Sequence, residues 1–295
     1  MNTTTTTATA ADLAFVTRAN ASAKTPVLFV HGLWLHATSW QPWVERFDAE
    51  GFVSYAPGWP GEADTVAETR RHPERVAGVG IEQITERYRG LIAQLDRKPI
   101  LVGHSFGGLI VQKLLGEGLG AAAVAIDPAQ GRGVYVLPPV QLRNALPVLG
   151  NPFQFRGANA QSQAHFAQAF GNAISREESD AIHEAVTIPS PGRPLFESAT
   201  ANVLPNSPAA VRVDAERGPL LIIGGGLDRT VPAASSRRVF RTYRNASTIT
   251  EYKEFADRGH SLVLDSRWPE IAAYALGWLR FVGVAPASET ADASA

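Results

Sequence analysis

Ser105 is the residue whose type and setting point most directly to chemistry. It stands in the centre of Gly-His-Ser-Phe-Gly, residues 103–107, after a mostly apolar run at 98–102 and before apolar residues at helical spacing over 108–115. These flanks predict a buried strand followed by a helix. Glycines on both sides of a serine are typical of a sharp strand-to-helix turn that lifts the hydroxyl clear of a sheet. The pattern predicts that Ser105 is a nucleophile.

A serine hydroxyl is a weak nucleophile unless a base, and a group that orients the base, accompany it. Asp228 follows a second apolar strand and three glycines, and His260 follows an alternating stretch at 249–255. In such an arrangement His260 takes the serine proton, and Asp228 accepts a hydrogen bond from the other ring nitrogen. We therefore expect Ser105, His260 and Asp228 to be the catalytic residues.

Asp127 is the alternative acid, because it also follows a short apolar strand. Asp228 is favoured because its strand is longer, ends in glycines and is followed by a Val-Pro pair. Asp257 and Asp265 lie too close to His260 along the chain to be favoured as its orienting group.

These motifs, together with a His-Gly pair at 31–32 after an apolar strand at 27–30, resemble the α/β-hydrolase superfamily, in particular its lidded serine esterase and perhydrolase-like branch. The likeness extends over about residues 26–282. It implies a mostly parallel central sheet with helices on both faces and an inserted helical lid. It also implies an oxyanion hole, in which the backbone N–H groups of Leu33 and Phe106 bind the charge of a tetrahedral intermediate.

Histidines other than His260 are interpreted as structural. On superfamily analogy His31 supports the oxyanion loop, and His104 points away from the pocket if Ser105 points into it. The remaining histidines are scattered singly and show no metal-ligand spacing: His36, His72, His165 and His183. Three glycines at 224–226 lack a phosphate-loop lysine. We expect no metal, nucleotide or other cofactor.

Composition is that of an ordinary enzyme. The chain has 295 residues, 27 basic and 28 acidic side chains, a formal net charge of −1 and no cysteine. Near-neutral charge gives no reason to expect nucleic acid as a partner, and the absence of cysteine excludes disulfides and thiolate metal sites. No apolar run of membrane-spanning length occurs. We expect a cytoplasmic enzyme with a disordered leader at 1–12, which lacks the features of a secretory signal, and a disordered tail at 285–295. The sequence leaves the oligomeric state open.

Alternation of strands and helices predicts the core of the molecule. Ligands of such parallel sheets bind beyond the carboxyl ends of the strands, which is where all four motifs fall. The core is expected over 13–127 and 217–284. Its first elements are an edge strand at 13–16, a strand at 27–30, a helix at 39–50 capped by Thr38 or Ser39, a strand at 52–55 and a helix at 81–95.

The alternation stops over residues 128–216, where prolines and glycines cluster between short helical patterns at 140–146, 160–172 and 177–186. Ser175 and Glu178 predict a capping box for the last of these helices. This inserted segment is expected to be the lid. The expected pocket residues are Trp34 and Trp59 from the core loops, and Phe153 and Phe166 from the inserted segment.

These residues predict a serine hydrolase that acts on a small or medium, largely apolar carboxylic ester, lactone or thioester, through an acyl-enzyme. Related enzymes with an aspartate at the elbow, the haloalkane dehalogenases and epoxide hydrolases, are disfavoured by Ser105. The alternatives are a cofactor-free perhydrolase or haloperoxidase, a carbon–carbon bond hydrolase, a hydroxynitrile lyase and a non-enzymatic receptor for a small ligand.

Overall fold

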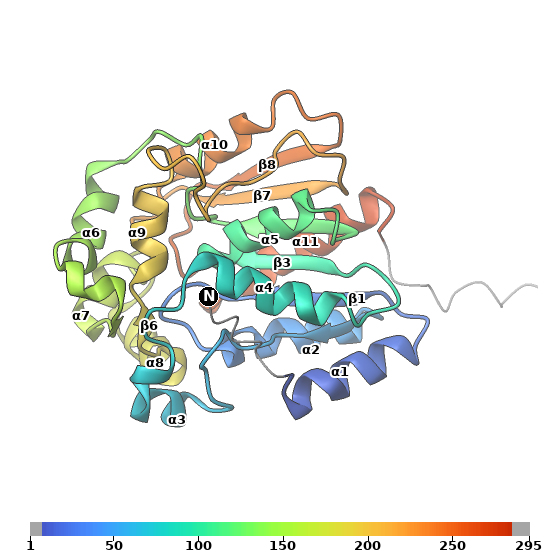
Figure 1. Ribbon diagram of the computed structural model, residues 1–295, viewed down its shortest axis with the longest axis horizontal. Coiled ribbons are helices and arrows are strands. Elements are labelled where there is room, and N and C mark those ends of the chain that lie inside the picture. The colour runs from blue at the N-terminus through green and yellow to red at the C-terminus, as the bar shows by residue number, and fades with distance from the viewer. Residues whose placement is uncertain (1–7, 285–295) are drawn as a thin grey trace, which may run out of the picture.

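A parallel sheet runs through the middle of the computed structural model, which describes residues 8–284 (Figure 1). Within those residues the sheet has six strands in the order β2-β1-β3-β4-β7-β8, and each neighbouring pair is parallel. The strands are β1 (Pro26–Val30), β2 (Val53–Tyr55), β3 (Ile100–His104), β4 (Ala122–Ile126), β7 (Leu220–Gly225) and β8 (Thr250–Phe255).

Helices cover both faces of this sheet. Successive side chains of each strand point to opposite sides, so each face presents apolar side chains that helices bury. On β3, Leu101 packs into one apolar cluster while Ile100 and Val102 pack into the other. The first cluster lies under α1 (Ala10–Asn20), α4 (Ile81–Ile92), α5 (Phe106–Gly116) and α10 (Ala233–Thr242), and the second under α2 (Gln41–Ala49) and α11 (Trp268–Phe281). The predicted α/β architecture is confirmed.

The N-terminal prediction is wrong. Residues 13–16, expected as an edge strand, lie inside α1, which begins within the expected leader. Thr9 and Asp12 form a capping box, with Thr9 N–H donating to Asp12 Oδ2 (2.7 Å) and Asp12 N–H donating to Thr9 Oγ1 (3.1 Å). Asp12 also binds the buried Arg87 of α4, so a tertiary ion pair fixes this helix. Residues 1–7 and the expected tail at 285–295 lie outside the described residues.

Two expected helix starts also differ in detail. The helix predicted at 39–50 begins as a 3₁₀ turn, Ala37–Trp40, and it is the His36 ring that accepts a hydrogen bond from Thr38 N–H. Ser175 Oγ accepts from Glu178 N–H as expected, but the Glu178 carboxylate accepts from the N–H of Ser266 and so forms only half of a capping box.

The inserted segment packs at one end of the sheet, at the left in Figure 1. Its elements are α6 (Pro139–Leu149), β5 (Ala158–Asn159), α7 (Gln163–Ala169), α8 (Arg176–Val186), β6 (Ser190–Pro191) and α9 (Arg193–Ala199). Helix α9 begins inside the proline-rich stretch, because Pro194 stands in its first turn, where a helix needs no backbone N–H. Across residues 8–284, no helix is long and apolar enough to cross a membrane. The short α3 (Val66–Arg71) packs beside α8 through hydrogen bonds of Arg70.

Candidate active site

Ser105 sits in a strained turn between β3 and α5. Its backbone angle φ is 56°, a value that residues other than glycine rarely adopt. A Cβ atom on Gly103 would collide with the carbonyl of Gly107, and a Cβ on Gly107 would collide with the carbonyl of Val30. Because neither Gly103 nor Gly107 has room for a side chain, glycine at both positions allows the turn that was expected around Ser105.

Asp228 and His260 lie together on the loops after β7 and β8. His260 Nδ1 is 2.5 Å from Asp228 Oδ2, and both side chains are fully buried. Asp228 Oδ1 accepts hydrogen bonds from the N–H groups of Thr230 (2.6 Å) and Val231 (2.8 Å). These two bonds fix the plane of the carboxylate, so the carboxylate in turn fixes the tautomer and orientation of the imidazole.

The other acids near His260 are occupied elsewhere. Asp265 binds the buried guanidinium of Arg258, and Asp257 binds Arg267 at 2.7 Å. Neither aspartate is paired with the imidazole.

Ser105 and His260 do not share a hydrogen bond within the described residues. The Nε2 atom of His260 is buried and has no hydrogen-bond partner there. Phe170 covers the imidazole edge-to-face at 4.6 Å between ring centroids, and the His104 ring lies 4.5 Å from it on another side. Such contacts between nucleophile and base often form only when substrate is bound. Among the described residues, His260 is therefore paired with Asp228 and not with Ser105.

Two backbone amides beside Ser105 are available as donors. Within residues 8–284, the N–H groups of Leu33 and Phe106 donate to no carbonyl or side chain, and both residues are buried. A Cβ on Gly32 would lie only 2.8 Å from Ser105 Cβ, so the loop after β1 passes directly against the elbow. Buried unpaired N–H groups are costly, and such donors suit an oxyanion.

The loop after β1 is held by contacts of His31 within the core and by a hydrogen bond from Trp34 to the inserted segment. His31 Nε2 lies 2.9 Å from the buried Glu62 carboxylate, and the His31 ring stacks on Trp59 at 4.6 Å. Trp34 N–H donates to Ser190 Oγ (2.6 Å). His31 thus has the supporting position that was expected, and its partner Glu62 was not identified from the sequence because no motif marks it.

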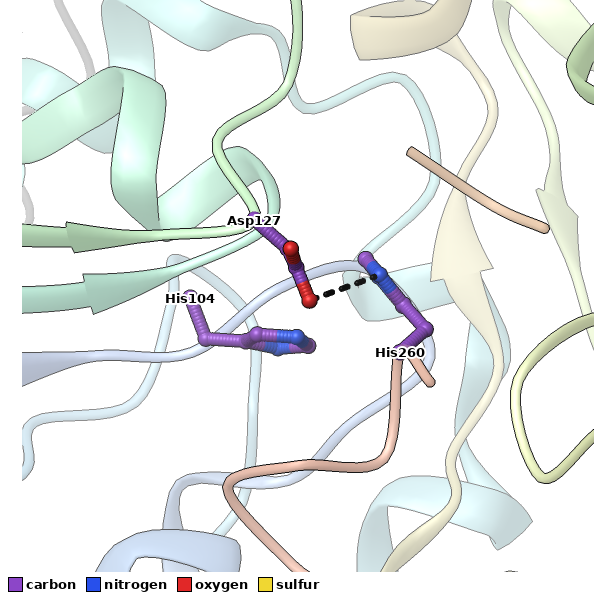
Figure 2. Close-up of side chains that lie close together, drawn as sticks. All are labelled: His104, Asp127 and His260. Carbon is purple, nitrogen blue, oxygen red and sulfur yellow. Dashed lines mark ion pairs between the residues drawn. The ribbon is translucent and has the colours of Figure 1, made fainter. Parts of the chain in front are cut away.

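Asp127 approaches the imidazole from the end of β4, as Figure 2 shows. Its Oδ2 lies 3.9 Å from His260 Nδ1, and its Oδ1 accepts a hydrogen bond from Gly225 N–H (2.7 Å). Burial, and then the neighbouring Asp228, raise the pKa of Asp127 well above its ordinary value. Burial holds the pKa of His104, the third residue in Figure 2, well below its ordinary value.

His104, Asp127 and His260 are the one group of described residues whose ligand atoms are close enough to consider for a metal ion. His260 Nδ1 directs its hydrogen to Asp228 and has no lone pair to offer there. The chemistry of this donor set fits hydrogen bonding better than metal ligation.

A cavity of about 290 Å³ opens above the elbow. Ser105, Phe106 and Trp34 form its floor, and the inserted segment forms its walls with residues that include Val134, Leu142 and Leu195. These wall residues were not identified from the sequence; the apolar face of the helix expected at 140–146 was the one available signal.

Three expected pocket residues lie elsewhere. Phe153 is 85% exposed at the surface, and Trp59 is buried against His31. Phe166 stacks on Phe170 at 4.7 Å, and Phe170 rather than Phe166 reaches the imidazole. Composition marks aromatic residues but not the direction in which a short helix turns them, so these predictions are wrong and only Trp34 lines the cavity.

Comparisons with known proteins agree with this fold. The sequence model described as "Alpha/beta hydrolase family" matches residues 27–274. A comparison with curated proteins finds no significant sequence match.

Among solved structures, the fold is similar to a monoacylglycerol lipase of Paleococcus ferrophilus, with 22% identity, a TM-score of 0.62 and coverage of 87% of this chain and 94% of that one. A putative non-heme bromoperoxidase of Mycobacterium tuberculosis has 19% identity, a TM-score of 0.65 and coverage of 88% and 92%. A methylesterase from Arabidopsis has 17% identity, a TM-score of 0.61 and coverage of 87% and 99%.

Proposed function

The chain belongs to the α/β-hydrolase family, and from this premise we propose that it is a serine esterase. Ser105 is the nucleophile, His260 the base and Asp228 the orienting acid. The observation that carries the proposal is the buried 2.5 Å contact between His260 and Asp228 on loops that converge on a strained serine turn. Esterases and a lipase among the similar folds favour an ester over other bonds.

The reaction follows from these positions. His260 Nε2 removes the proton of Ser105 as the hydroxyl oxygen attacks the ester carbonyl. The Leu33 and Phe106 amides stabilise the resulting oxyanion, and loss of one such donor typically costs about 3–4 kcal/mol. His260 then protonates the leaving alcohol, and water repeats the sequence on the acyl-enzyme. Asp228 stabilises the imidazolium in both halves.

The cavity favours a small or medium, largely apolar acyl group. Several polar groups in its wall are already engaged: Gln130 binds Gln141 (3.0 Å), and Asn202 binds the carbonyl of Val134 (2.8 Å). With these groups used for structure, apolar side chains provide most of the contact that a substrate can make. A lactone or thioester fits the same description.

We also propose a second candidate activity, the kind of partner and the location. Similarity to a bromoperoxidase fold keeps a cofactor-free perhydrolase as the second candidate, since it would use the same residues. Three further proposals rest on the sequence alone: a small-molecule ester as the partner, no nucleic-acid or membrane partner, and a cytoplasmic location.

Labelling of Ser105 by a fluorophosphonate, together with turnover of p-nitrophenyl acetate, tests the proposal. We expect both, and we expect Ser105→Ala to abolish both. Labelling without turnover of any ester, lactone or thioester in a substrate panel would favour a receptor. Peracid formation from acetate and hydrogen peroxide at a rate above ester hydrolysis would favour the perhydrolase.

A further inference from the structure

A second carboxyl group lies behind the proposed catalytic acid. Asp127 directly follows β4, and Asp228 lies on the loop after β7, the neighbouring strand in the sheet. The backbone ties the two strand ends together, because Asp127 N–H donates to the Ile223 carbonyl (2.8 Å) and Gly225 N–H donates to Asp127 Oδ1 (2.7 Å). The carboxyl group of Asp127 is thus held in place independently of His260.

Both carboxyl groups turn one oxygen toward the same ring nitrogen. Asp228 Oδ2 is 2.5 Å and Asp127 Oδ2 is 3.9 Å from His260 Nδ1. The single Nδ1 hydrogen is used by Asp228, and Asp127 Oδ2 is left buried with no hydrogen-bond partner that the structure describes. A buried oxygen without a donor is unfavourable as a carboxylate oxygen, whereas a protonated one can itself donate.

The surrounding charges do not favour two carboxylates. Arg258 is the nearby cation, but it is shared among Asp265, Glu270 (3.2 Å) and the Arg267 carbonyl (3.1 Å). The titratable groups that face Asp127 come from four elements. They are His104 at the end of β3, Asp228 on the loop after β7, Tyr252 on β8, and Arg258 and His260 on the loop after β8.

We infer that Asp127 is a neutral carboxylic acid that donates its proton in a hydrogen bond to the Asp228 carboxylate, and that it acts as a positioning residue for the proposed hydrolysis. This inference rests on the proposed function for its catalytic part. Burial, followed by the charge of Asp228 and a hydrogen bond to it, raises the pKa of Asp127 well above its ordinary value, in agreement with the neutral form.

The hydrogen bond has a defined consequence for the base. An O–H group that donates to Asp228 withdraws part of the negative charge that would otherwise stabilise the imidazolium. Neutral His260 is therefore kept available as a base to lower pH. The same bond adds a third contact that fixes the Asp228 carboxylate, beside those from Thr230 and Val231.

Asp127→Asn and Asp127→Gly separate these roles. Asn keeps an acceptor for Gly225 N–H and an N–H donor for Asp228, and asparagine tolerates the φ of 41° at this position. Glycine also tolerates that φ but has neither group. We expect kcat of Asp127→Asn within about threefold of wild type. We expect Asp127→Gly to lose about 10- to 100-fold in kcat with little change in KM, the usual effect of losing a hydrogen bond to a charged group.

The pH profile of kcat/KM shows in which direction removal of Asp127 moves the acid limb. Without a donor, Asp228 stabilises the imidazolium more strongly, so the acid limb of kcat/KM for Asp127→Gly moves to higher pH, while that of Asp127→Asn stays in place. If Asp127 were ionised, its removal would move the limb to lower pH. Asp228→Asn, measured in parallel, shows the cost of removing the acid itself. A loss in Asp127→Asn as large as in Asp228→Asn overturns the inference, and so does wild-type kcat in Asp127→Gly.

Infrared difference spectra test the protonation without substrate. Wild type at pH 7 is expected to show a buried protonated-carboxyl C=O band that Asp127→Asn lacks and Ser105→Ala retains. Absence of the band overturns the inference even if the enzyme is an esterase. Presence of the band in a protein that turns over no ester keeps the neutral carboxyl and rejects the proposed function instead. If Asp127→Gly does not fold, the protonated-carboxyl C=O band and the pH profile of Asp127→Asn test the inference instead.

Discussion

At the scale of single residues, the proposed hydrolysis depends on one hydroxyl, one imidazole and one carboxylate. Ser105 is exposed to the cavity through a forced turn, and the carboxylate of Asp228 is fixed by two backbone amides. Because the nucleophile and its base act as a unit, removing either one removes nearly the whole rate enhancement that they provide.

Ser105→Ala and His260→Ala are each expected to lower kcat by about 10⁶-fold, with a smaller loss for Asp228→Asn. The measurement is the steady-state hydrolysis of p-nitrophenyl acetate, with circular dichroism to show that each variant is folded. Near wild-type activity in Asp228→Ala, combined with an inactive Asp127→Ala, would assign the acid to the end of β4 instead.

The proposed mechanism requires a neutral imidazole. The acid limb of kcat/KM, measured from about pH 5 to 8, is therefore expected to follow one ionisation, with activity rising as pH rises. A profile that is flat across this window would contradict a histidine base.

At the scale of elements, the loops after the strands of the sheet carry the proposed catalytic residues, and the inserted segment provides the cavity walls. The two are fastened together at the acid loop, where Thr230 Oγ1 donates to the Ala169 carbonyl (2.9 Å) and Asn172 Nδ2 donates to the Leu227 carbonyl (2.8 Å). Helix α7 is thus connected to the Asp228 loop, and Phe170, directly after α7, covers the His260 ring.

Substrate choice is expected to change with the cavity walls that the inserted segment contributes. Ala145→Leu adds volume to the cavity and should lower kcat/KM for octanoate relative to acetate esters, while Val134→Ala should raise the same ratio. Pocket contacts discriminate by about 1–3 kcal/mol per methylene. Phe153→Ala is the matched control, because its ring is exposed and lies outside the cavity. An unchanged ratio in both wall variants would place the substrate elsewhere.

Phe166→Ala should behave differently from a wall substitution. Its ring is fully buried between α7 and α8, and core Phe→Ala changes typically cost about 3–5 kcal/mol. We expect a lower free energy of unfolding in urea and no change in chain-length preference. A changed preference with wild-type stability would return this residue to the pocket.

At the scale of the whole molecule, stability is linked to the buried ionisable groups behind the elbow. His104 is fully buried at the end of β3, and neither ring nitrogen has a hydrogen-bond partner in the described part of the chain. Burial lowers the pKa of His104, so the folded state keeps it neutral while the unfolded chain takes up a proton below about pH 6.5.

Stability is therefore expected to fall as pH drops below about 6.5, with His104 contributing a slope of up to about 1.4 kcal/mol per pH unit. His104→Leu removes this proton uptake and should flatten the dependence. Urea unfolding at several pH values between 5 and 7 measures it. Equal slopes in wild type and variant would show that His104 does not control acid unfolding.

The sequence by itself determined the elements and the order of the chemical groups. The elbow around Ser105 needs two glycines that no other residue can replace. The inner strands are recognisable as apolar runs because both of their faces are buried, whereas the edge strand β8 shows only an alternating pattern. These patterns can be recognised locally, from residues that lie close together in the sequence, although the atom that excludes a side chain at Gly107 is the Val30 carbonyl of β1. The helix at 10–20 shows the limit, because a short apolar pattern was compatible with a strand and a capping box with a distant ion pair decided the outcome.

Only the tertiary structure decided which groups meet. Asp127 and Asp228 are far apart in the chain, yet neighbouring strands bring both carboxyl groups to one imidazole. Glu62 reaches His31, and Phe170 rather than Phe166 reaches His260, through packing of loops and short helices. Spacing along a chain fixes side-chain direction within one element, but the contacts between elements depend on how their surfaces fit together, so the cavity walls and the second carboxyl group became visible only in three dimensions.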